Sequence, residues 1–275
     1  MAEQARDHAR RWLVEPGEDA DLDHRPTRST EGAPGDKEIT EAACDVLVAR
    51  LADLQQRLWA EHRRSLLLVL QALDTGGKDG TIRHVLSGVN PQGVDVAGFK
   101  VPTEIERAHD FLWRIHQKVP GDGHIGVFNR SHYEDVLVVR VDELVPEDVW
   151  RPRFDRIRAF EEGLVADGTT IVKCYLHISR DEQKERFQAR LDEPHKRWKF
   201  SQADLDVRSK WDDYRVAYEE AITRTSTADA PWYVIPADRK WYRNWAVLNI
   251  LVAALEEMDP QFPEPEAGLD DLVIE

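Results

Sequence analysis

The chain has 275 residues, 41% of them hydrophobic, and a formal net charge of −15 at pH 7. It is long enough for one large α/β core, and it contains no run of about 18 apolar residues that would span a membrane. The excess of acidic residues argues against general nucleic-acid binding, which needs a broad basic face. The N-terminus has no apolar stretch of the signal-peptide type, so we expect a cytoplasmic protein.

Both ends of the chain are expected to lie outside the core. Residues 1–38 are polar and rich in Gly, Pro and Asp, which predicts an irregular N-terminal arm. From Ile39 to about His62, apolar residues recur at the spacing of an amphipathic helix. Residues 259–275 contain three Pro and many acidic residues, which predicts an acidic C-terminal tail. The predicted domain therefore spans residues 39–258.

A glycine-rich loop follows the first predicted strand. Ser65–Leu73 is an apolar segment typical of a buried strand, and it leads directly into Asp74-Thr-Gly-Gly-Lys-Asp-Gly-Thr81. A short helix is expected after the loop, so its N–H groups and the helix N-terminus would form a phosphate site. The loop departs from the standard G-x-x-x-x-G-K-[ST] pattern at Ala72 and Asp79. A glycine-rich turn with a surface Lys is the alternative interpretation.

The rest of the chain alternates predicted strands with predicted helices. We expect further strands at residues 94–101, 124–128, 169–178 and 232–235, and further helices at residues 103–117, 151–167, 179–191, 201–225 and 238–258. This alternation predicts an α/β fold in which a parallel sheet of five strands has helices on both faces. Cys44 and Cys174 fall in a predicted helix and a predicted strand, so core packing is expected for both.

A polar segment, Asn129–Glu134, comes directly after the third predicted strand. Ligands of such sheets gather at the carboxyl ends of the strands, where this segment and the glycine-rich loop would meet. Arg130 is suited to contact phosphate oxygens with its planar guanidinium. The alternative for Arg130 is a structural salt bridge, and the alternative for Asn129 is a cap at the strand end.

A basic loop follows the predicted helix at residues 179–191. Its cations surround Trp198 between two helices, in the lid position of many phosphoryl-transfer enzymes, and they are Arg190, Lys196, Arg197 and Lys199. In a chain this acidic, such a cluster indicates a binding place for a polyanion. Alternatively, these side chains pair with acidic neighbours on a solvated face, as Arg186 would with Glu182.

Four segments in order resemble the family-2 polyphosphate kinases over about Gly35 to Met258. They are residues 66–93, 128–141, 193–201 and 230–245. The resemblance implies a three-layer, thymidylate-kinase-like P-loop kinase fold with a helical lid at about residues 179–225. It also implies Mg²⁺-dependent transfer of phosphoryl groups between inorganic polyphosphate and nucleotides, and a homo-oligomer.

The resemblance carries roles to matching residues of this chain. As catalytic residues it implies Asp74, which would also hold the metal, with Lys78, Asn129, Arg130 and Arg190. For phosphate and polyphosphate binding it implies Thr75, Gly76, Gly77, Asp79, Gly80, Thr81, Arg83, Lys196, Arg197 and Lys199. For nucleotide binding it implies Asn129, Tyr133 and Glu134.

Asn129 bears on the choice of acceptor. Asn-Arg-Ser followed by Tyr-Glu resembles the subgroup that accepts both mono- and diphosphates, which implies AMP, ADP, GMP and GDP as substrates. A neutral amide would present less charge to the acceptor phosphate than Asp does in other members. Two alternatives stay open: an ATP-dependent nucleotide or small-molecule kinase of the same fold, and a P-loop protein that binds polyphosphate or nucleotide without turnover.

Overall fold

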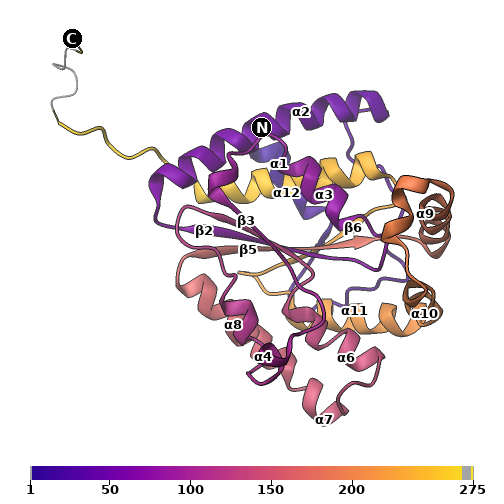
Figure 1. Cartoon of the computed structure of the whole chain (residues 1–275). Coiled ribbons are helices and arrows are strands. Elements are labelled where there is room, and N and C mark those ends of the chain that lie inside the picture. Colours follow the sequence, from indigo (N-terminus) through magenta and orange to yellow (C-terminus); the bar gives the residue numbers. More distant parts are fainter. Residues whose placement is uncertain (1, 268–273, 275) are drawn as a thin grey trace.

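Strand β2 (Ser65–Gln71) lies at the centre of the sheet, and each of its residues is buried. The computed structural model describes residues 2–267 and residue 274. Its sheet has the strand order β1-β6-β5-β2-β4-β3 (Figure 1). The other strands are β1 (Leu13–Val14), β3 (Val94–Gly98), β4 (Ile125–Asn129), β5 (Thr169–His177) and β6 (Trp232–Pro236). The five predicted strands are confirmed, and all five run parallel.

The N-terminal segment differs from the prediction of an irregular arm. It contains helix α1 (Ala2–Arg10) and strand β1, which pairs antiparallel with β6 as a sixth strand. Helix α1 packs on α12, and Trp12 is buried beside it. The strand has only two residues, and the buried face of α1 carries only the small side chains of Ala5 and Ala9, so the large apolar residues of the sequence did not reveal them.

Helices cover both faces of the sheet because the side chains of β2 alternate between two cores. Leu66, Leu68 and Leu70 belong to the core under α2 (Lys37–Glu61) and α12 (Lys240–Met258). Leu67 and Val69 belong to the core under α8 (Arg153–Ala166) and α11 (Trp211–Thr225). Figure 1 shows these two helical layers above and below the strands. The predicted three-layer α/β fold is therefore confirmed.

Shorter elements connect these layers. They are α3 (Lys78–Val85), α4 (Glu104–Arg107), α5 (Trp113–His116), α6 (Val138–Val141), α7 (Glu147–Trp150), α9 (Arg180–Asp192) and α10 (Ala203–Ser209), with the 3₁₀ helices Pro91–Gly93, His132–Asp135 and Pro194–Lys199.

Two of the predicted helices are interrupted. The helix expected at residues 103–117 is the pair α4 and α5, because Asp110 accepts a hydrogen bond from the Leu112 N–H and closes a turn. The helix expected at residues 201–225 divides at Lys210 into α10 and α11.

The C-terminal residues lie beyond this core. Residues 259–267 contain neither helix nor strand and lead away from the rest of the molecule (Figure 1). Of the predicted acidic tail, residues 268–273 and residue 275 lie outside the described residues. No described helix has the length and apolar character needed to cross a membrane.

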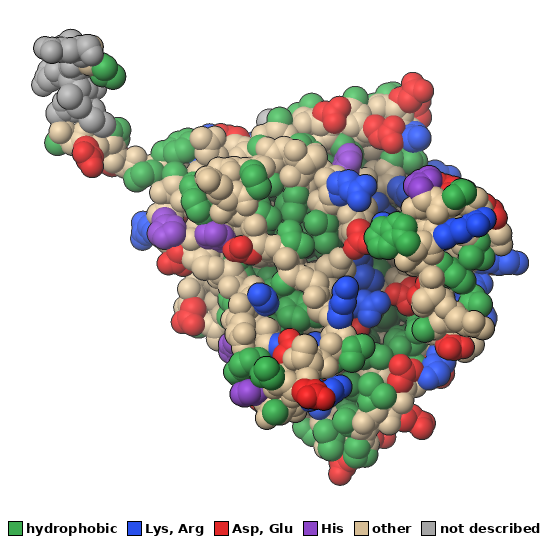
Figure 2. Space-filling view, in the orientation of Figure 1, with side chains coloured by type: hydrophobic (Ala, Val, Ile, Leu, Met, Phe, Trp, Pro, Cys, Tyr) green, Lys and Arg blue, Asp and Glu red, His purple; other side chains and the backbone are tan. Residues whose placement is uncertain are grey.

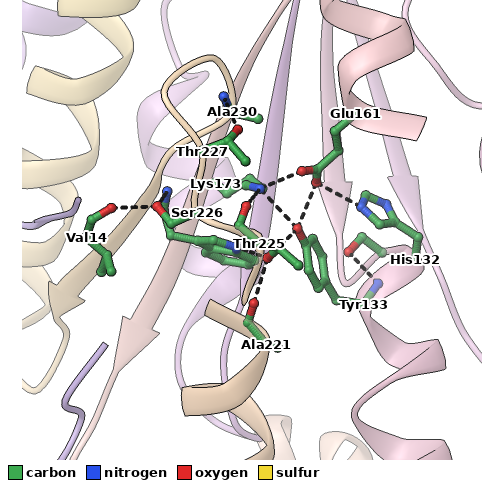
Figure 3. Close-up of polar contacts among 12 residues, drawn as sticks. Val14, His132, Tyr133, Glu161, Lys173, Ala221, Thr225, Ser226, Thr227 and Ala230 are labelled. Carbon is green, nitrogen blue, oxygen red and sulfur yellow. Dashed lines mark hydrogen bonds and ion pairs between the residues drawn. The ribbon is translucent and has the colours of Figure 1, made fainter. Parts of the chain in front are cut away.

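A buried ion pair joins four elements beneath the sheet (Figure 3). The Lys173 ammonium on β5 donates to Glu161 on α8 at 2.6 Å and to the Thr225 carbonyl at the end of α11 at 2.7 Å. The same carboxylate accepts from Tyr133 at 2.8 Å and lies 3.1 Å from His132 Nε2. Although burial raises the pKa of Glu161, the Lys173 charge and the His132 contact hold it below its ordinary value. Glu161 is therefore kept as a carboxylate.

We predict that Lys173→Met destabilises the fold strongly, because it leaves the Glu161 carboxylate buried without a counter-charge. Breaking such a pair on one side costs about 3–5 kcal/mol. The measurement is the free energy of unfolding from urea titration. The double variant Lys173→Met/Glu161→Leu should recover much of the loss, since no charge is then buried. Equal urea midpoints for the wild type and Lys173→Met would contradict this account.

Candidate active site

The glycine-rich loop connects β2 to α3 through a backbone that only small residues can follow. A side chain at Gly76 would collide with Ala72 and come within 2.8 Å of the Leu73 carbonyl oxygen. Gly77 has φ +105° and is the N-cap of α3, and Thr75 is also left-handed at φ +62°. The loop thus turns directly into a helix N-terminus, which is the arrangement that binds phosphate.

A cavity of about 480 Å³ lies over this loop and brings distant segments of the chain together. Asp74 to Gly80 form one wall, and the remaining lining residues are Gly98, Phe99, Lys100, Val101, Asn129, Arg130, Arg190 and Lys199. Figure 2 shows Lys and Arg side chains gathered around the recess in the middle of this face. The cavity lies at the carboxyl ends of β2, β3 and β4, where the sequence predicted it.

Two side chains of α9 hold the loop in place by donating hydrogen bonds to its carbonyl oxygens from outside the cavity. Arg186 Nη1 donates to the Thr75 and Gly76 carbonyls at 2.9 and 3.1 Å. Gln183 Nε2, one turn earlier on α9, donates to the Asp74 carbonyl at 3.0 Å. Arg186 also pairs with Glu182, but it is buried against the loop and does not lie on a solvated face. The N–H groups of Gly76 and Thr81 donate to the Leu73 and Gly77 carbonyls, which leaves those of residues 77–80 for the cavity.

Lys78 is half-buried, and its ammonium donates to the Ala72 carbonyl at 2.7 Å. Burial, and then the nearby charge of Arg130, lower the pKa of Lys78 to about 8, against the opposing effects of Asp74 and Glu134. A phosphate in the cavity would favour the charged ammonium and raise this pKa again. Lys78 is therefore a cation whose charge the neighbouring carboxylates offset only in part.

Arg130 comes directly after β4 and divides its contacts between two carboxylates. Its Nη2 lies 2.9 Å from Asp74 Oδ1 and its Nη1 lies 3.6 Å from Glu134 Oε2. The backbone at Arg130 is left-handed, with φ +64°. The side chain stays 41% exposed, so it is salt-bridged and still open to a ligand. Next to it, Asn129 Nδ2 donates to Asp79 Oδ1 of the loop at 2.7 Å.

The carboxylates fit a magnesium ion only together with substrate oxygens. Among the residues that the structure describes, no group of three or more His, Cys, Asp or Glu could hold a metal ion alone. Mg²⁺ is commonly bound by one or two carboxylates plus substrate phosphates, and Asp74 lines the cavity. Glu134 Oε1 is buried without a hydrogen-bond partner, and burial raises the pKa of Glu134. The donor set therefore suits a metal that arrives with phosphates.

Several residues with predicted roles lie away from the cavity. Thr81 is buried and donates to the Gly77 carbonyl, and Arg83 is exposed on α3. Lys196 pairs with Glu193 at 2.5 Å, and Arg197 donates to the Leu191 carbonyl.

In contrast, Arg190 lines the cavity beside Lys199, whose carbonyl accepts a hydrogen bond from Arg190 Nη1 at 3.0 Å.

The prediction that Tyr133 binds nucleotide is wrong. Its side chain is 0% exposed and its hydroxyl belongs to the Lys173–Glu161 network in Figure 3. The 3₁₀ helix His132–Asp135 turns Tyr133 into the core, while Glu134 faces a second cavity. Adjacent residues of a tight turn point in different directions, and the motif alone did not show which one faces the ligand.

A second cavity of about 480 Å³ adjoins the first and was not expected from the sequence. Both are lined by Phe99, Lys100, Val101 and Arg130. The second has an apolar wall of Phe111, Val138, Val139, Leu144 and Val145, and charged side chains such as Glu106, Arg114 and Arg153 line the rest of it. Phe99 and Lys100 follow β3 just as Arg130 follows β4, so the rule that ligands gather at strand ends would have identified them.

Comparison with known proteins gives a consistent result. Residues 35–263 match the family model described as polyphosphate kinase 2. The chain is 54% identical to the AMP/ADP-polyphosphate phosphotransferase of Meiothermus ruber, over 97% of this chain and 100% of that protein. It is 46% identical to the ADP-polyphosphate phosphotransferase of Rhodopseudomonas palustris, over 93% and 92% of the two chains. The crystal structure of polyphosphate kinase 2 from Arthrobacter aurescens superposes with a TM-score of 0.93 at 44% identity, covering 96% of this chain and 94% of that chain.

We predict that Lys78→Ala weakens binding of inorganic tripolyphosphate about tenfold or more, because it removes a desolvated ammonium from the phosphate cavity. Titration calorimetry gives the affinity, and the thermal unfolding midpoint should stay close to that of the wild type. Arg83→Ala is the matched control, since Arg83 is exposed and does not line the cavity. If both variants bound tripolyphosphate like the wild type, the loop would be only a turn.

Proposed function

Because this chain belongs to the polyphosphate kinase 2 family, we propose that it is a phosphotransferase that moves phosphoryl groups between inorganic polyphosphate and AMP or ADP. One observation carries this proposal: the loop N–H groups, Lys78, Arg130 and Arg190 converge on one cavity that opens into a second, apolar one. The first suits a chain of phosphates, and the second suits the nucleoside of an acceptor.

The acceptor nucleotide lies across the boundary between the two cavities in this proposal. Phe99 and Arg130 line both, so the base would rest in the apolar cavity while its phosphates reach the loop past Arg130. The apolar cavity also holds polar groups, among them Glu134 and Arg114, that can hydrogen-bond a purine. Use of GMP and GDP beside AMP and ADP is part of the proposal, as are the cytoplasmic location and the homo-oligomer.

Phosphoryl transfer depends mainly on in-line positioning and on neutralising charge over the equatorial oxygens. The N–H groups at the start of α3 and Lys78 hold the phosphates at the loop. Arg130 and Arg190 line the same cavity and stabilise the charge of the transferring group. Transfer can run in both directions, because the phosphoanhydride bond broken in the donor resembles the one formed in the product.

Asp74 would hold Mg²⁺ together with substrate phosphates, and the metal would neutralise their charge. In the free protein, Asp74 is paired with Arg130 at 2.9 Å. Of segment 179–225, predicted as the lid, α11 packs in the core under the sheet, so α9 and α10 with the basic loop between them act as the lid. It already touches the loop through Gln183 and Arg186, so its position and that of the loop are linked.

Product analysis tests this function. AMP, ADP, GMP and GDP are incubated separately with long-chain polyphosphate as sole donor, with Mg²⁺ or with EDTA, and the nucleotides are separated by chromatography. We expect ADP and ATP from AMP, ATP from ADP, and no product in EDTA. Transfer from ATP but none from polyphosphate would support an ordinary kinase. Binding without any product would support a non-catalytic protein.

We predict that Asn129→Asp lowers the efficiency for AMP relative to ADP about tenfold or more. The amide now donates to Asp79, and a carboxylate there would add repulsion that the single phosphate of AMP must meet at close range. The measurement is kcat/KM for both acceptors at saturating polyphosphate. Asn129→Ala, which removes the amide without adding charge, should change the ratio less. An unchanged ratio in Asn129→Asp would exclude this residue from acceptor choice.

We predict that Lys199→Ala raises the KM for long polyphosphate several-fold, about as expected for loss of one phosphate contact, and weakens its salt dependence. Lys199 lines the cavity, whereas Lys196 is already paired with Glu193. Lys196→Ala is therefore the matched control and should have the smaller effect. The KM for the nucleotide should change little in both variants. Equal effects on polyphosphate and nucleotide would contradict a polyphosphate path at Lys199.

A further inference from the structure

Arg243, in the first turn of α12, is a buried cation with no anionic partner. It is 3% exposed. Its Nε and Nη2 donate to Asn244 Oδ1 at 3.2 and 2.8 Å, and no carboxylate among the described residues forms a salt bridge with it. Burial, and then the neighbouring charge of Arg186, lower the pKa of Arg243 to about 9. A buried guanidinium without a counter-ion costs the free protein stability.

The guanidinium of Arg243 lies directly against the phosphate loop. A Cβ added to Gly77 would collide with Arg243 Nη1 and lie 3.0 Å from its Cζ, and one added to Gly80 would lie 3.6 Å from Nη2. Gly77 and Gly80 both line the phosphate cavity. Arg243 is therefore separated from a bound phosphate by little more than one layer of backbone.

The surroundings of Arg243 add positive charge. Helix α12 starts at Lys240 after Arg239 and has neither an acidic residue in its first turn nor a side-chain cap. Burial, and then the charges of Arg186 and Arg243, lower the pKa of Lys240. Arg186 has Glu182 as partner and loop carbonyls as acceptors, so the uncompensated charge is that of Arg243. An anion close to Arg243 would offset this charge.

We propose that Arg243 strengthens phosphate binding from behind the loop, where it supplies counter-charge beneath Gly77 to the phosphates on the other side, and that the ligand-free protein loses stability by keeping it there. The proposal rests on the proposed function, since it assigns the ligand as a chain of condensed phosphates. The alternative is that Arg243 only braces the loop, in which case its removal would destabilise the free protein.

Stability and affinity together separate these two roles. The variants are Arg243→Met, which keeps length and removes charge, and Arg243→Lys, which keeps charge. Arg50→Met is the matched control, because Arg50 forms salt bridges with Asp53 and Glu256 at 2.8 and 2.9 Å and does not line the phosphate cavity. Thermal unfolding is measured with and without inorganic tripolyphosphate, and titration calorimetry gives its Kd at fixed ionic strength.

We expect the ligand-free Arg243→Met protein to unfold at the wild-type temperature or above, and its Kd for tripolyphosphate to rise about tenfold. The Kd of Arg243→Lys should lie between the Kd of the wild type and that of Arg243→Met. Arg50→Met should unfold at a lower temperature with an unchanged Kd. A wild-type Kd in Arg243→Met, or a variant that fails to fold or melts several degrees lower, would overturn the proposal. If the wild type itself neither bound tripolyphosphate nor used polyphosphate, the proposed function would fail instead.

Discussion

Mutual repulsion between cations around the glycine-rich loop is the constraint on which the site depends. Lys78, Arg130, Arg186 and Arg243 surround a few residues of backbone in a chain whose net charge is −15. Burial and neighbouring positive charge lower the pKa values of Lys78 and Arg243. Such shifts are expected where several cations lie close together and are shielded from water. The carboxylates of Asp74, Glu134 and Glu182 offset this positive charge only in part. The negative charge of bound phosphates would neutralise the remainder.

The fold tolerates this repulsion because rigid elements hold each cation separately. Arg186 is tied to four backbone carbonyls, those of Thr75, Gly76, Ala237 and Asp238, which belong to the loop and to the turn after β6. The backbone of Arg130 is fixed because its N–H donates to the Leu70 carbonyl near the carboxyl end of β2. The buried Lys173–Glu161 pair joins the turn after β4 to α8 and α11. A site prepared in this way needs little rearrangement when charge develops on a substrate.

The sequence predicted the parts of the site that are continuous in the chain. The order of strand, glycine-rich loop and helix located the loop, and a polar segment after an apolar strand located Asn129 and Arg130. Residues that depend on long-range packing were missed: Arg243 reaches the loop from α12, and Phe99 reaches the cavity from β3. Tyr133 was misassigned because a motif does not show which side chain of a tight turn enters the core. Lys196 and Arg197 differ from Lys199 only through local pairing, which composition does not reveal.

The two adjoining cavities separate the chemistry from the choice of acceptor. Backbone N–H groups and cations bind phosphate whatever base it carries, so the phosphate cavity is indifferent to the nucleoside. The apolar cavity touches the reacting region only through residues that line both, chiefly Phe99 and Arg130. Under the proposed function, changes deep in that cavity would alter base preference without disturbing transfer, whereas a change at Asn129, which contacts the loop itself, would alter the preference between mono- and diphosphate acceptors. Acceptor length and base identity are then controlled by different residues, and a single fold can serve acceptors that differ in either respect.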